Sequence, residues 1–552
     1  MKKYLICLIG VVFVSTFFLY KIGGFGLFDF DEAVYAETSR EMLETGDFIN
    51  PRYNYMPFYE KPILFYWLTC ISYRIFGINE FSTRVVSSVS CIVLVFLTYY
   101  FGKILINKRA GMLAAIILTT NTGIIIISKA AIMDGLLTLF ISSSLYCFLA
   151  GYITGNKSFY WGFYISSALA VMTKGIVGIV IPAAVVVWFI LVRKQNIREI
   201  KLVPGIAIFL LISLPWYIVV TVISKGSFFN DFFIHHNIQR FSQPFTGHSG
   251  SILYYIPVIL IGLFPWSAFL PGSIRNSIKQ RGPVHLFLLM WVVVPTALFS
   301  ISQTKLPSYI IPVFPAFALI GGVYFDKKFS FSKGEGYKFN TESKICWSIF
   351  FVLVLLMSLV FAMNGFLIDK AKANFLEDAP YLNQFIDFGL APLILAAILL
   401  VSSAVLYFFL RYKNIRAVFG VFVVLMVIFN FMFMTYIMPS AWKYMQGCLY
   451  HFSNIVRAES GDGDKLIGYD VCQPSILFYT RKKMIACSKN DLERIKNELN
   501  HASNTSNVYV ITKQSLFQKL SEAVNSQVIR RCSGYTLLKG QPAPPHSFAS
   551  HN

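Results

Sequence analysis

Charged side chains are scarce in this chain of 552 residues, at 14% of the total, where a soluble protein of this size carries about a quarter. Only 27 residues are Asp or Glu, against 48 Lys or Arg, and 56% are hydrophobic. The formal net charge of +21 would suggest nucleic acid binding in a soluble chain. Here, however, the chain also contains repeated apolar runs that are long enough to cross a bilayer. We therefore expect the basic residues in loops that contact anionic lipids, and we expect no nucleic acid partner.

Several familiar signals are also missing. The sequence contains no Walker loop, no G-x-G-x-x-G motif and no repeat of 20–50 residues, which excludes the common nucleotide-binding and solenoid folds. No small-residue cleavage site follows the apolar start MKKYLICLIGVVFVSTFFLY. We therefore expect a retained first helix rather than a signal peptide.

Apolar runs of about 20 residues recur along most of the chain and predict a polytopic α-helical membrane protein of about thirteen spans. The predicted spans are 4–20, 84–104, 110–128, 131–152, 158–173, 175–193, 202–223, 252–270, 284–301, 308–325, 345–368, 388–410 and 417–438. Residues 55–77 are apolar enough to lie in the interface or to re-enter the membrane. Residues 1–443 are expected to form this membrane domain.

The loops on the same side as the N-terminus are short and rich in Lys and Arg, as in Lys103–Arg109 and Arg193–Lys201. Cytoplasmic loops carry such an excess of basic residues. The sequence therefore predicts a cytoplasmic N-terminus, with the loops 21–83 and 224–251 and everything after residue 438 outside.

The chain becomes polar after about residue 444, and residues 444–540 are expected to form a small external α/β domain. The segments DKLIGYD, SILFYT and NVYVIT are typical of strands, and NDLERIKNELNHA and KQSLFQKLSEAV of amphipathic helices. Four cysteines fall in this region, and outside the cytoplasm they could pair in three ways or stay as thiols. The Pro- and Ser-rich residues 541–552 are predicted to be disordered.

The first external loop is unusually acidic, because GGFGLFDFDEAVYAETSREMLETGDFI holds seven Asp or Glu residues. Its helical part predicts an interfacial helix whose Glu37, Glu41 and Glu44 face water. Asp31 and Glu32 stand at the start of that helix among aromatic residues. Either acid could simply be a helix cap.

Other ionisable residues are expected on the same external side. Glu60 and Lys61 lie in FYEKPILFYW, Asp134 ends an apolar helix, and Lys174 and Lys305 stand at the mouths of spans. Ionisable groups at such depth are costly enough to indicate function. Carboxylates there can deprotonate an acceptor or hold a divalent cation, and lysines can hold a phosphate.

An activated substrate used outside the cytoplasm has to arrive in the membrane, since nucleotide sugars are absent there. A polyprenyl-phosphate sugar meets that requirement, and the reaction would be displacement at its anomeric carbon with the lipid phosphate leaving. A transporter is the main competing class. Transporters, however, bind near the bilayer midplane in broken helices, whereas these residues lie at span ends.

The motifs resemble those of the lipid A aminoarabinose transferases, within the wider GT-C glycosyltransferases that include the protein O-mannosyltransferases. The resemblance covers residues 28 to about 320 and is carried by FDEAVYAETSREML, FYEKPILFYW, AAIMDGLLTLF, VMTKGIVGIVIP, SLPWYIVV, FFIHHNIQRF, YYIPVILIGLFPW and TKLPSYIIPVFPAFAL. The E-K-P and T-K-L-P-S-Y segments are the ones that point to the aminoarabinose group.

The resemblance implies a role for each candidate residue. Asp31 and Asp134 would be the catalytic acids, and Glu32 and Tyr35 would lie near the sugar or acceptor. The donor phosphate would be held by the basic residues Lys61, Lys174, Arg240 and Lys305. Some relatives suggest a divalent metal ion shared by Glu60 and His248; the alternative interpretation of His248 is an ordinary loop histidine, and the motifs themselves require no cofactor.

The resemblance therefore implies a glycosyltransferase of the bacterial inner membrane, active on its periplasmic face. It would move 4-amino-4-deoxy-L-arabinose from undecaprenyl phosphate to lipid A of lipopolysaccharide, although relatives carrying other sugars keep the sugar open. Two alternatives stay open as well: a protein O-mannosyltransferase acting on peptides, and a lipid or sugar flippase that forms no new bond.

Overall fold

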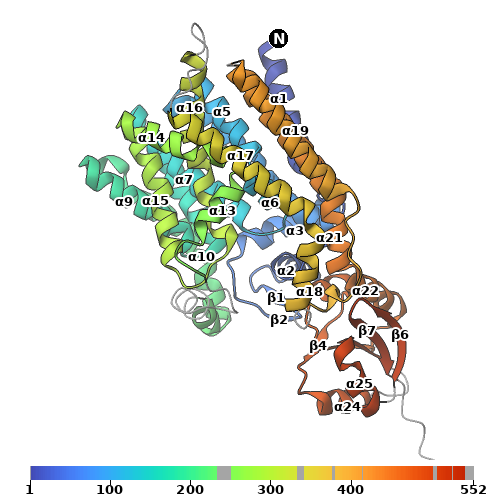
Figure 1. Cartoon of the computed structure of the whole chain (residues 1–552). Helices are drawn as coiled ribbons and strands as arrows, with labels where there is room; N and C mark the ends of the chain where they lie inside the picture. The colour runs from blue at the N-terminus through green and yellow to red at the C-terminus, as the bar shows by residue number, and fades with distance from the viewer. Residues whose placement is uncertain are drawn as a thin grey trace, which may run out of the picture.

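A bundle of long helices and a smaller C-terminal domain make up the molecule, with the domain at the end of the bundle opposite the N-terminus (Figure 1). The computed structural model describes residues 2–232, 250–331, 341–375, 379–412, 414–500, 507–524 and 526–540. The end of the bundle that carries the C-terminal domain is called the domain face below.

Eight helical segments of the described part are long and apolar enough to cross a membrane. They are Glu80–Leu105, Asp134–Thr154, Ile197–Ile223, Pro283–Ile301, Pro307–Lys328, Thr341–Ala362, Ala391–Arg411 and Ile415–Met445. Two bent pairs raise the number to ten: Lys108–Thr119 with Thr122–Ser128, bent by 61°, and Tyr255–Gly262 with Trp266–Gln280, bent by 112°. The chain is a multi-pass membrane protein.

The predicted count of thirteen spans is confirmed in part. All the predicted spans overlap helices, but 110–128, 252–270 and 345–368 each cover more than one helical element. The spans 4–20, 158–173 and 175–193 fall on helices of 18, 16 and 17 residues that are not among the segments counted above. The described part of the structure thus supports eight to ten spans.

The helices of the membrane part follow in chain order. They are α1 (Lys2–Leu19), α2 (Asp31–Thr45), α3 (Leu64–Phe76), α4 (Glu80–Leu105), α5 (Lys108–Thr119), α6 (Thr122–Ser128), α7 (Asp134–Thr154), α8 (Phe159–Lys174), α9 (Val177–Arg193), η1 (Ile197–Ile200), α10 (Leu202–Ile223), α11 (Ser227–Phe229), α13 (Tyr255–Gly262), η3 (Trp266–Phe269), α14 (Leu270–Gln280), α15 (Pro283–Ile301), η4 (Pro307–Val313), α16 (Phe314–Phe331), α17 (Thr341–Ala362), α18 (Asn364–Phe375), η5 (Pro380–Leu382), α19 (Ala391–Arg411), α20 (Ile415–Met432), η6 (Phe433–Ile437) and α21 (Met438–Met445). A short hairpin of β1 (Arg52–Tyr53) and β2 (Met56–Pro57) stands in the first loop.

Small residues allow α4 and α5 to pack backbone against backbone. A Cβ atom added to Gly102 would lie 2.7 Å from the Cα of Gly111, and one added to Gly322 would lie 2.5 Å from the Ala110 carbonyl oxygen. Membrane helices rely on such close approach because lipid supplies no hydrophobic drive for association. These contacts hold α4, α5 and α16 together.

A mixed five-stranded sheet forms the core of the C-terminal domain. Its strands are β3 (Lys465–Tyr469), β4 (Met484–Cys487), β5 (Val508–Lys513), β6 (Ser526–Cys532) and β7 (Tyr535–Gly540), in the spatial order β4-β3-β5-β7-β6. β3 runs parallel to β4 and β5, whereas β7 runs antiparallel to β5 and β6. The helices are α22 (Gly447–Glu459), α23 (Pro474–Thr480), α24 (Leu492–Asn500) and α25 (Gln514–Ala523). Residues 541–552, which were predicted to be disordered, lie outside the described part of the chain.

One predicted strand of this domain is wrong, because SILFYT belongs to helix α23. All seven residues Pro474–Thr480 are buried, and an apolar run that is buried all round does not distinguish a strand from a helix by its pattern. Pro474 stands in the first turn, where its missing N–H costs nothing, and Arg481 ends the helix in a left-handed conformation. The strands at 465–469 and 508–513 and the two amphipathic helices are confirmed.

The prediction that the acids of α2 face water is wrong for Glu37 and Glu41, both of which are 0% exposed. Arg40 lies between them and binds both oxygens of Glu37 at 2.7 and 2.8 Å, and it also binds the exposed Glu44. Glu41 accepts the Tyr55 N–H at 2.8 Å. The C-terminal domain packs against α2 through α23, so this charged helix is enclosed instead of lying on the membrane surface (Figure 1).

Burial of Glu41 predicts that the protein becomes less stable as pH rises. Burial, with the nearby charge of Glu37, raises the pKa of Glu41 from 4.5 to about 8. A carboxyl group that keeps its proton in the fold stabilises fully below pH 4.5, and this stabilisation is lost as pH rises through about 8. Glu41→Gln should therefore flatten the fall in Tm between about pH 6 and about pH 9. Glu44→Gln is the exposed control and should keep the wild-type slope; equal slopes in all three proteins would contradict the assignment.

Three hydrogen-bonded contacts fix the C-terminal domain to the first loop. The Ser475 N–H and hydroxyl donate to Asp29 at 2.8 and 2.7 Å. The side-chain amide of Asn54 donates to the Met484 carbonyl at 2.8 Å and accepts the Met484 N–H at 2.9 Å. The Leu27 N–H donates to the Tyr479 hydroxyl at 2.8 Å. These bonds hold the start of α2, where Asp31 stands, against a rigid support.

Candidate active site

Asp31 is the first residue of α2 and is exposed at the domain face. Among the described residues no hydrogen bond or ion pair of its side chain is found. One turn further on, Tyr35 is buried and packs edge-on against Phe65 and Tyr66 of α3, at ring distances of 6.0 and 6.1 Å. The helix thus presents a solvated carboxylate above a layer of aromatic rings.

Glu60 and Lys61 precede α3 on the same face. Their side chains are 37% and 11% exposed, and the Lys61 ammonium lies 3.9 Å from the Glu60 carboxylate. Lys61 also donates to the Glu60 carbonyl at 3.4 Å. Pro62, which is buried, follows directly and keeps the pair at the end of the loop.

Asp134 and Lys174 form a buried ion pair at the domain-face ends of α7 and α8. The Lys174 ammonium lies 2.7 Å from the Asp134 carboxylate, and the side chains are 15% and 8% exposed. The same ammonium lies 4.8 Å from the ring centre of Tyr309 in η4. A carboxylate at the start of α7 is also favoured by the helix dipole.

Helix packing brings these carboxylates toward Tyr35, because α2 packs on α3, α3 contacts α8, and α8 packs on α7. Burial raises the pKa of Tyr35, and the charges of Asp31, Asp134 and Glu60 raise it further. Such an influence requires all three carboxylates to lie near one phenol. Five segments of the sequence therefore meet in one place, which is called the domain-face cluster below: Asp31, Tyr35, Glu60, Lys61, Asp134, Lys174 and Tyr309.

Lys305, which was predicted to bind the donor phosphate, makes structural contacts at the border of this cluster. The Lys305 ammonium donates to three carbonyl oxygens, those of Phe299, Ser300 and Ser302, at 3.4, 2.8 and 2.8 Å. It is 5% exposed and caps the C-terminal end of α15. Its positive charge thus stays beside the cluster, near η4.

Glu32 binds Arg84 of α4 through both oxygens, at 2.7 and 2.8 Å, and accepts the backbone N–H groups of Phe28 and Ala131. Arg84 is 0% exposed and donates to three carbonyls of residues 22–26. Arg84 was not among the predicted site residues. The signal for it was a basic residue at the start of the apolar span 84–104, where an arginine needs a partner.

Arg240 and His248 lie outside the described residues, so their predicted roles stay predictions. The shared metal ion of Glu60 and His248 is untested for the same reason. Among the described residues no group of three His, Cys, Asp or Glu side chains could hold a metal ion. The Lys61 ammonium beside Glu60 disfavours a second cation at that carboxylate.

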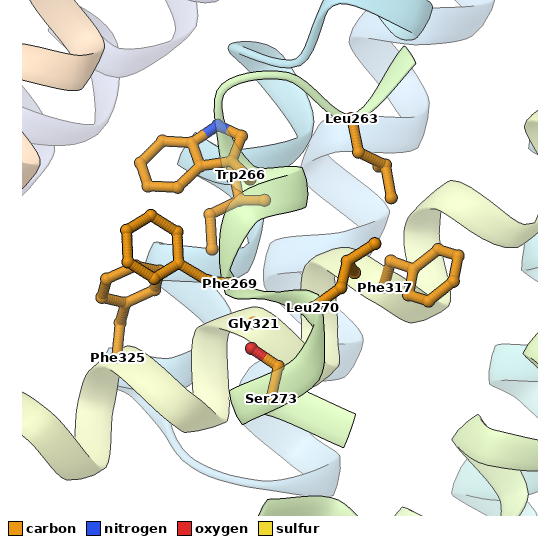
Figure 2. A pocket seen from close by; sticks show the side chains of 9 residues that line it. Leu263, Trp266, Phe269, Leu270, Ser273, Phe317, Gly321 and Phe325 are labelled. Atoms are coloured by element: carbon orange, nitrogen blue, oxygen red, sulfur yellow. The ribbon is translucent and has the colours of Figure 1, made fainter. Parts of the chain in front are cut away.

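An apolar pocket lies in the bundle away from the domain-face cluster, where the chain bends between α13 and α14. Figure 2 shows its wall of aromatic and aliphatic side chains around a single hydroxyl group, that of Ser273. The lining residues are Ile117, Leu263, Trp266, Phe269, Leu270, Ser273, Phe317, Gly321 and Phe325. No charged side chain takes part, so the pocket lacks the groups that acid–base or phosphate chemistry needs.

Solved structures resemble this chain in fold, and known proteins resemble it in sequence. The crystal structure of ArnT from Cupriavidus metallidurans bound to undecaprenyl phosphate matches with a TM-score of 0.80 at 21% identity, over 98% of this chain and 99% of that one. The chain has the ArnT fold. An archaeal oligosaccharyltransferase, AglB from Archaeoglobus fulgidus, matches more distantly, with a TM-score of 0.53 and 14% identity over 99% of this chain and 75% of that one.

Sequence comparison of this ArnT-like chain gives the same relatives. The model of the dolichyl-phosphate-mannose-protein mannosyltransferase family matches residues 3–229. The undecaprenyl phosphate-alpha-4-amino-4-deoxy-L-arabinose arabinosyl transferase of Pectobacterium atrosepticum is 33% identical over 56% of this chain and 57% of that protein. The second enzyme of this name in Proteus mirabilis is 33% identical over 57% of this chain and 59% of that protein. The match thus spans less than two thirds of these relatives, and the predicted resemblance is confirmed.

Proposed function

We propose that this chain is an integral membrane glycosyltransferase that moves 4-amino-4-deoxy-L-arabinose from undecaprenyl phosphate to lipid A. One observation carries the proposal: acids and lysines from four distant segments meet in the domain-face cluster, at the ends of spans. The name of the Pectobacterium relative supports this donor and this sugar. The undecaprenyl phosphate in the Cupriavidus structure supports a lipid-linked donor.

The orientation follows from the loops. Short basic loops stand at the end of the bundle that holds the N-terminus, and the C-terminal domain stands at the other (Figure 1). The positive-inside rule then favours a cytoplasmic N-terminus, with the cluster and the C-terminal domain on the opposite side, which is the periplasm for a bacterial inner membrane. An odd number of spans, such as the predicted thirteen, is part of this proposal. A lipid-linked donor reaches this face with its sugar and phosphate exposed and its tail in the bilayer.

The reaction is a displacement at the anomeric carbon of the sugar. An oxygen of the acceptor attacks that carbon, the bond to the donor phosphate breaks, and undecaprenyl phosphate leaves with the electron pair. Lys61 holds the phosphate and stabilises the charge that develops on it. Arg240, which lies outside the described residues, is proposed for the same role. Lys305 adds positive charge from the end of α15, where its ammonium caps the helix.

Asp31 acts on the acceptor. A lipid A phosphate is already ionised at neutral pH, so no strong base is needed, and Asp31 orients the attacking group and the sugar instead. Its exposed position fits a group that meets a large substrate from the solvent side. A cationic amino sugar is also attracted by the carboxylates of Asp31 and Glu60. Glu32 supports this end of the site through Arg84.

Asp134 is expected to act through Lys174, because the two form a 2.7 Å ion pair. Asp134→Asn alone should lower kcat/KM about tenfold or more, which corresponds to about 1.4 kcal/mol of lost stabilisation of the transition state. In a Lys174→Ala background the same change should add little, because the partner is gone. Initial rates of the two single variants and the double variant measure this coupling. Losses that simply add would show that Asp134 works independently of Lys174.

Two other functions predict different products. A protein O-mannosyltransferase, the function named by the matching family model, would label a Ser/Thr peptide. A flippase would move the donor across the bilayer without forming a bond. The position of the cluster at span ends favours transfer over transport, because transporters place their ionisable sites near the midplane.

The proposal is tested in a Gram-negative host that makes the lipid-linked aminoarabinose but lacks its own transferase. Expression of the wild-type chain should add the mass of one or more aminoarabinose groups to lipid A in its mass spectrum. The Asp31→Asn variant at equal membrane abundance should leave lipid A unmodified. Unmodified lipid A with abundant, correctly inserted wild-type protein would overturn the proposed function.

A further inference from the structure

Two thiols of the C-terminal domain lie in contact although they stand 84 positions apart. Cys448, in the first turn of α22, donates its S–H to the carbonyl oxygen of Cys532 at 2.9 Å. The two side chains are close enough for each to shift the pKa of the other. Among the described residues, Cys472 and Cys487 of the same domain show no such contact with a thiol, which leaves one pairing favoured of the three that the sequence allows.

The two thiols differ in exposure and in acidity. Cys448 is 5% exposed, whereas Cys532 is half-buried at the end of β6. The hydrogen bond from Cys448 lowers the pKa of the Cys532 thiol to about 6, despite an opposing effect of burial. The same contact and burial raise the pKa of Cys448. Cys532 is therefore the nucleophilic thiolate at neutral pH, and Cys448 is the thiol that reacts in the second step of an exchange.

The two cysteines lie where the C-terminal domain joins the membrane helices. Helix α22 follows α21, the end of the last candidate span Ile415–Met445. The turn after Cys532 contacts the loop before α19: the Ser533 hydroxyl donates to the Gln384 side chain at 2.7 Å. Gly534 adopts a positive φ of 82° so close to Pro380 that an added Cβ would lie 2.3 Å from its carbonyl oxygen. A cross-link here would join the last span to the hairpin that holds this loop.

We propose that Cys448 and Cys532 form a structural disulfide in the mature protein, made by exchange with a protein disulfide of the compartment that holds the C-terminal domain. The inference rests on the periplasmic orientation given with the proposed function, since disulfides persist in oxidising compartments. It does not depend on which sugar or acceptor the enzyme uses.

The exchange balances with one oxidant of the disulfide class. The Cys532 thiolate attacks one sulfur of the oxidant disulfide, which releases one thiolate of the oxidant and leaves a mixed disulfide. Cys448 then loses its proton and attacks the Cys532 sulfur, which releases the second thiolate of the oxidant. Two thiols of this chain are oxidised and the oxidant disulfide is reduced to two thiols.

The test uses the full-length protein in cells whose outer membrane alone has been made permeable. A membrane-impermeant maleimide is added first and quenched, the protein is denatured without reductant, and a second, isotopically distinct maleimide is added. Peptide mass spectrometry then assigns the label at each cysteine. Cys472 is exposed and reports the side on which the domain lies. Cys487, which is buried without a thiol contact, reports labelling of an ordinary buried thiol.

The expected result is Cys472 with the first label, Cys487 with the second, and a cross-linked peptide of Cys448 and Cys532 that accepts label only after reduction. Cys448→Ser should make Cys532 reactive before reduction. Cys472 labelled from outside together with Cys448 and Cys532 that react without reduction would overturn the disulfide while leaving the orientation intact. Cys472 that reacts only after the inner membrane is opened would overturn the orientation, and the disulfide with it.

Discussion

Replacing Asp31 by Asn is expected to abolish transfer while the protein still folds and inserts. The carboxylate is exposed, and no partner of its side chain is found among the described residues, so the isosteric amide removes a charge without leaving a buried group unpaired. Loss of the correct position of a substrate costs about 100-fold in rate. We therefore expect kcat/KM to fall by about two orders of magnitude or more with an unchanged Tm. Initial rates in proteoliposomes and a thermal unfolding curve check both parts.

Asp369→Asn is the matched control for this experiment. Asp369 is an exposed carboxylate on α18, outside the domain-face cluster. Its variant should keep wild-type kcat/KM, because a general loss of surface charge has no route to the reacting atoms. Wild-type activity in Asp31→Asn would remove Asp31 from the mechanism, and an equal loss in both variants would make the effect one of general charge.

Lys61→Ala is expected to have the second large effect. The ammonium is 11% exposed and lies 3.9 Å from Glu60. Its removal takes away a charge that stabilises the departing phosphate and leaves Glu60 to repel it. Loss of one such group from a preorganised site costs about 100-fold or more in kcat. We also expect a raised KM for the lipid-linked donor, and Lys61→Arg should keep part of the activity because it keeps the charge.

Lys519→Ala serves as the control for a lost surface lysine, since Lys519 is exposed on α25 of the C-terminal domain. Steady-state rates over a range of donor concentrations separate KM from kcat. If Lys61→Ala alters neither quantity, or alters both only as much as Lys519→Ala does, then Lys61 does not hold the donor phosphate.

The place of the domain-face cluster could be predicted from the sequence because hydrophobic runs fix which ends of the helices share a side. Asp134 begins α7 and Lys174 ends α8, so alternation of spans alone brings them to one face. Their 2.7 Å ion pair, and the aromatic layer of Tyr35 and Tyr66 beneath Asp31, depend on helix packing that no local pattern specifies.

The buried charges were harder to predict. The sequence pattern predicted a solvated helix face for Glu37 and Glu41. Their burial depends on the C-terminal domain, which covers α2 but lies more than 400 positions further along the chain. Glu32 was predicted to lie near the sugar or acceptor, whereas the structure pairs it with Arg84 at the start of an apolar span. The T-K-L-P-S-Y segment suggested a phosphate-binding role for Lys305, which stays a prediction. Its three carbonyl contacts depend on how α15 ends, which no local pattern specifies.

The most direct test of the central claim is transfer by the purified chain in proteoliposomes with radiolabelled undecaprenyl-phosphate aminoarabinose. Lipid A and a Ser/Thr peptide are offered as acceptors, and the donor in each leaflet is measured in parallel. The proposed function predicts label in lipid A, lost in Asp31→Asn and Lys61→Ala. Label in the peptide, or donor that only changes leaflet while both acceptors stay unlabelled, would contradict it.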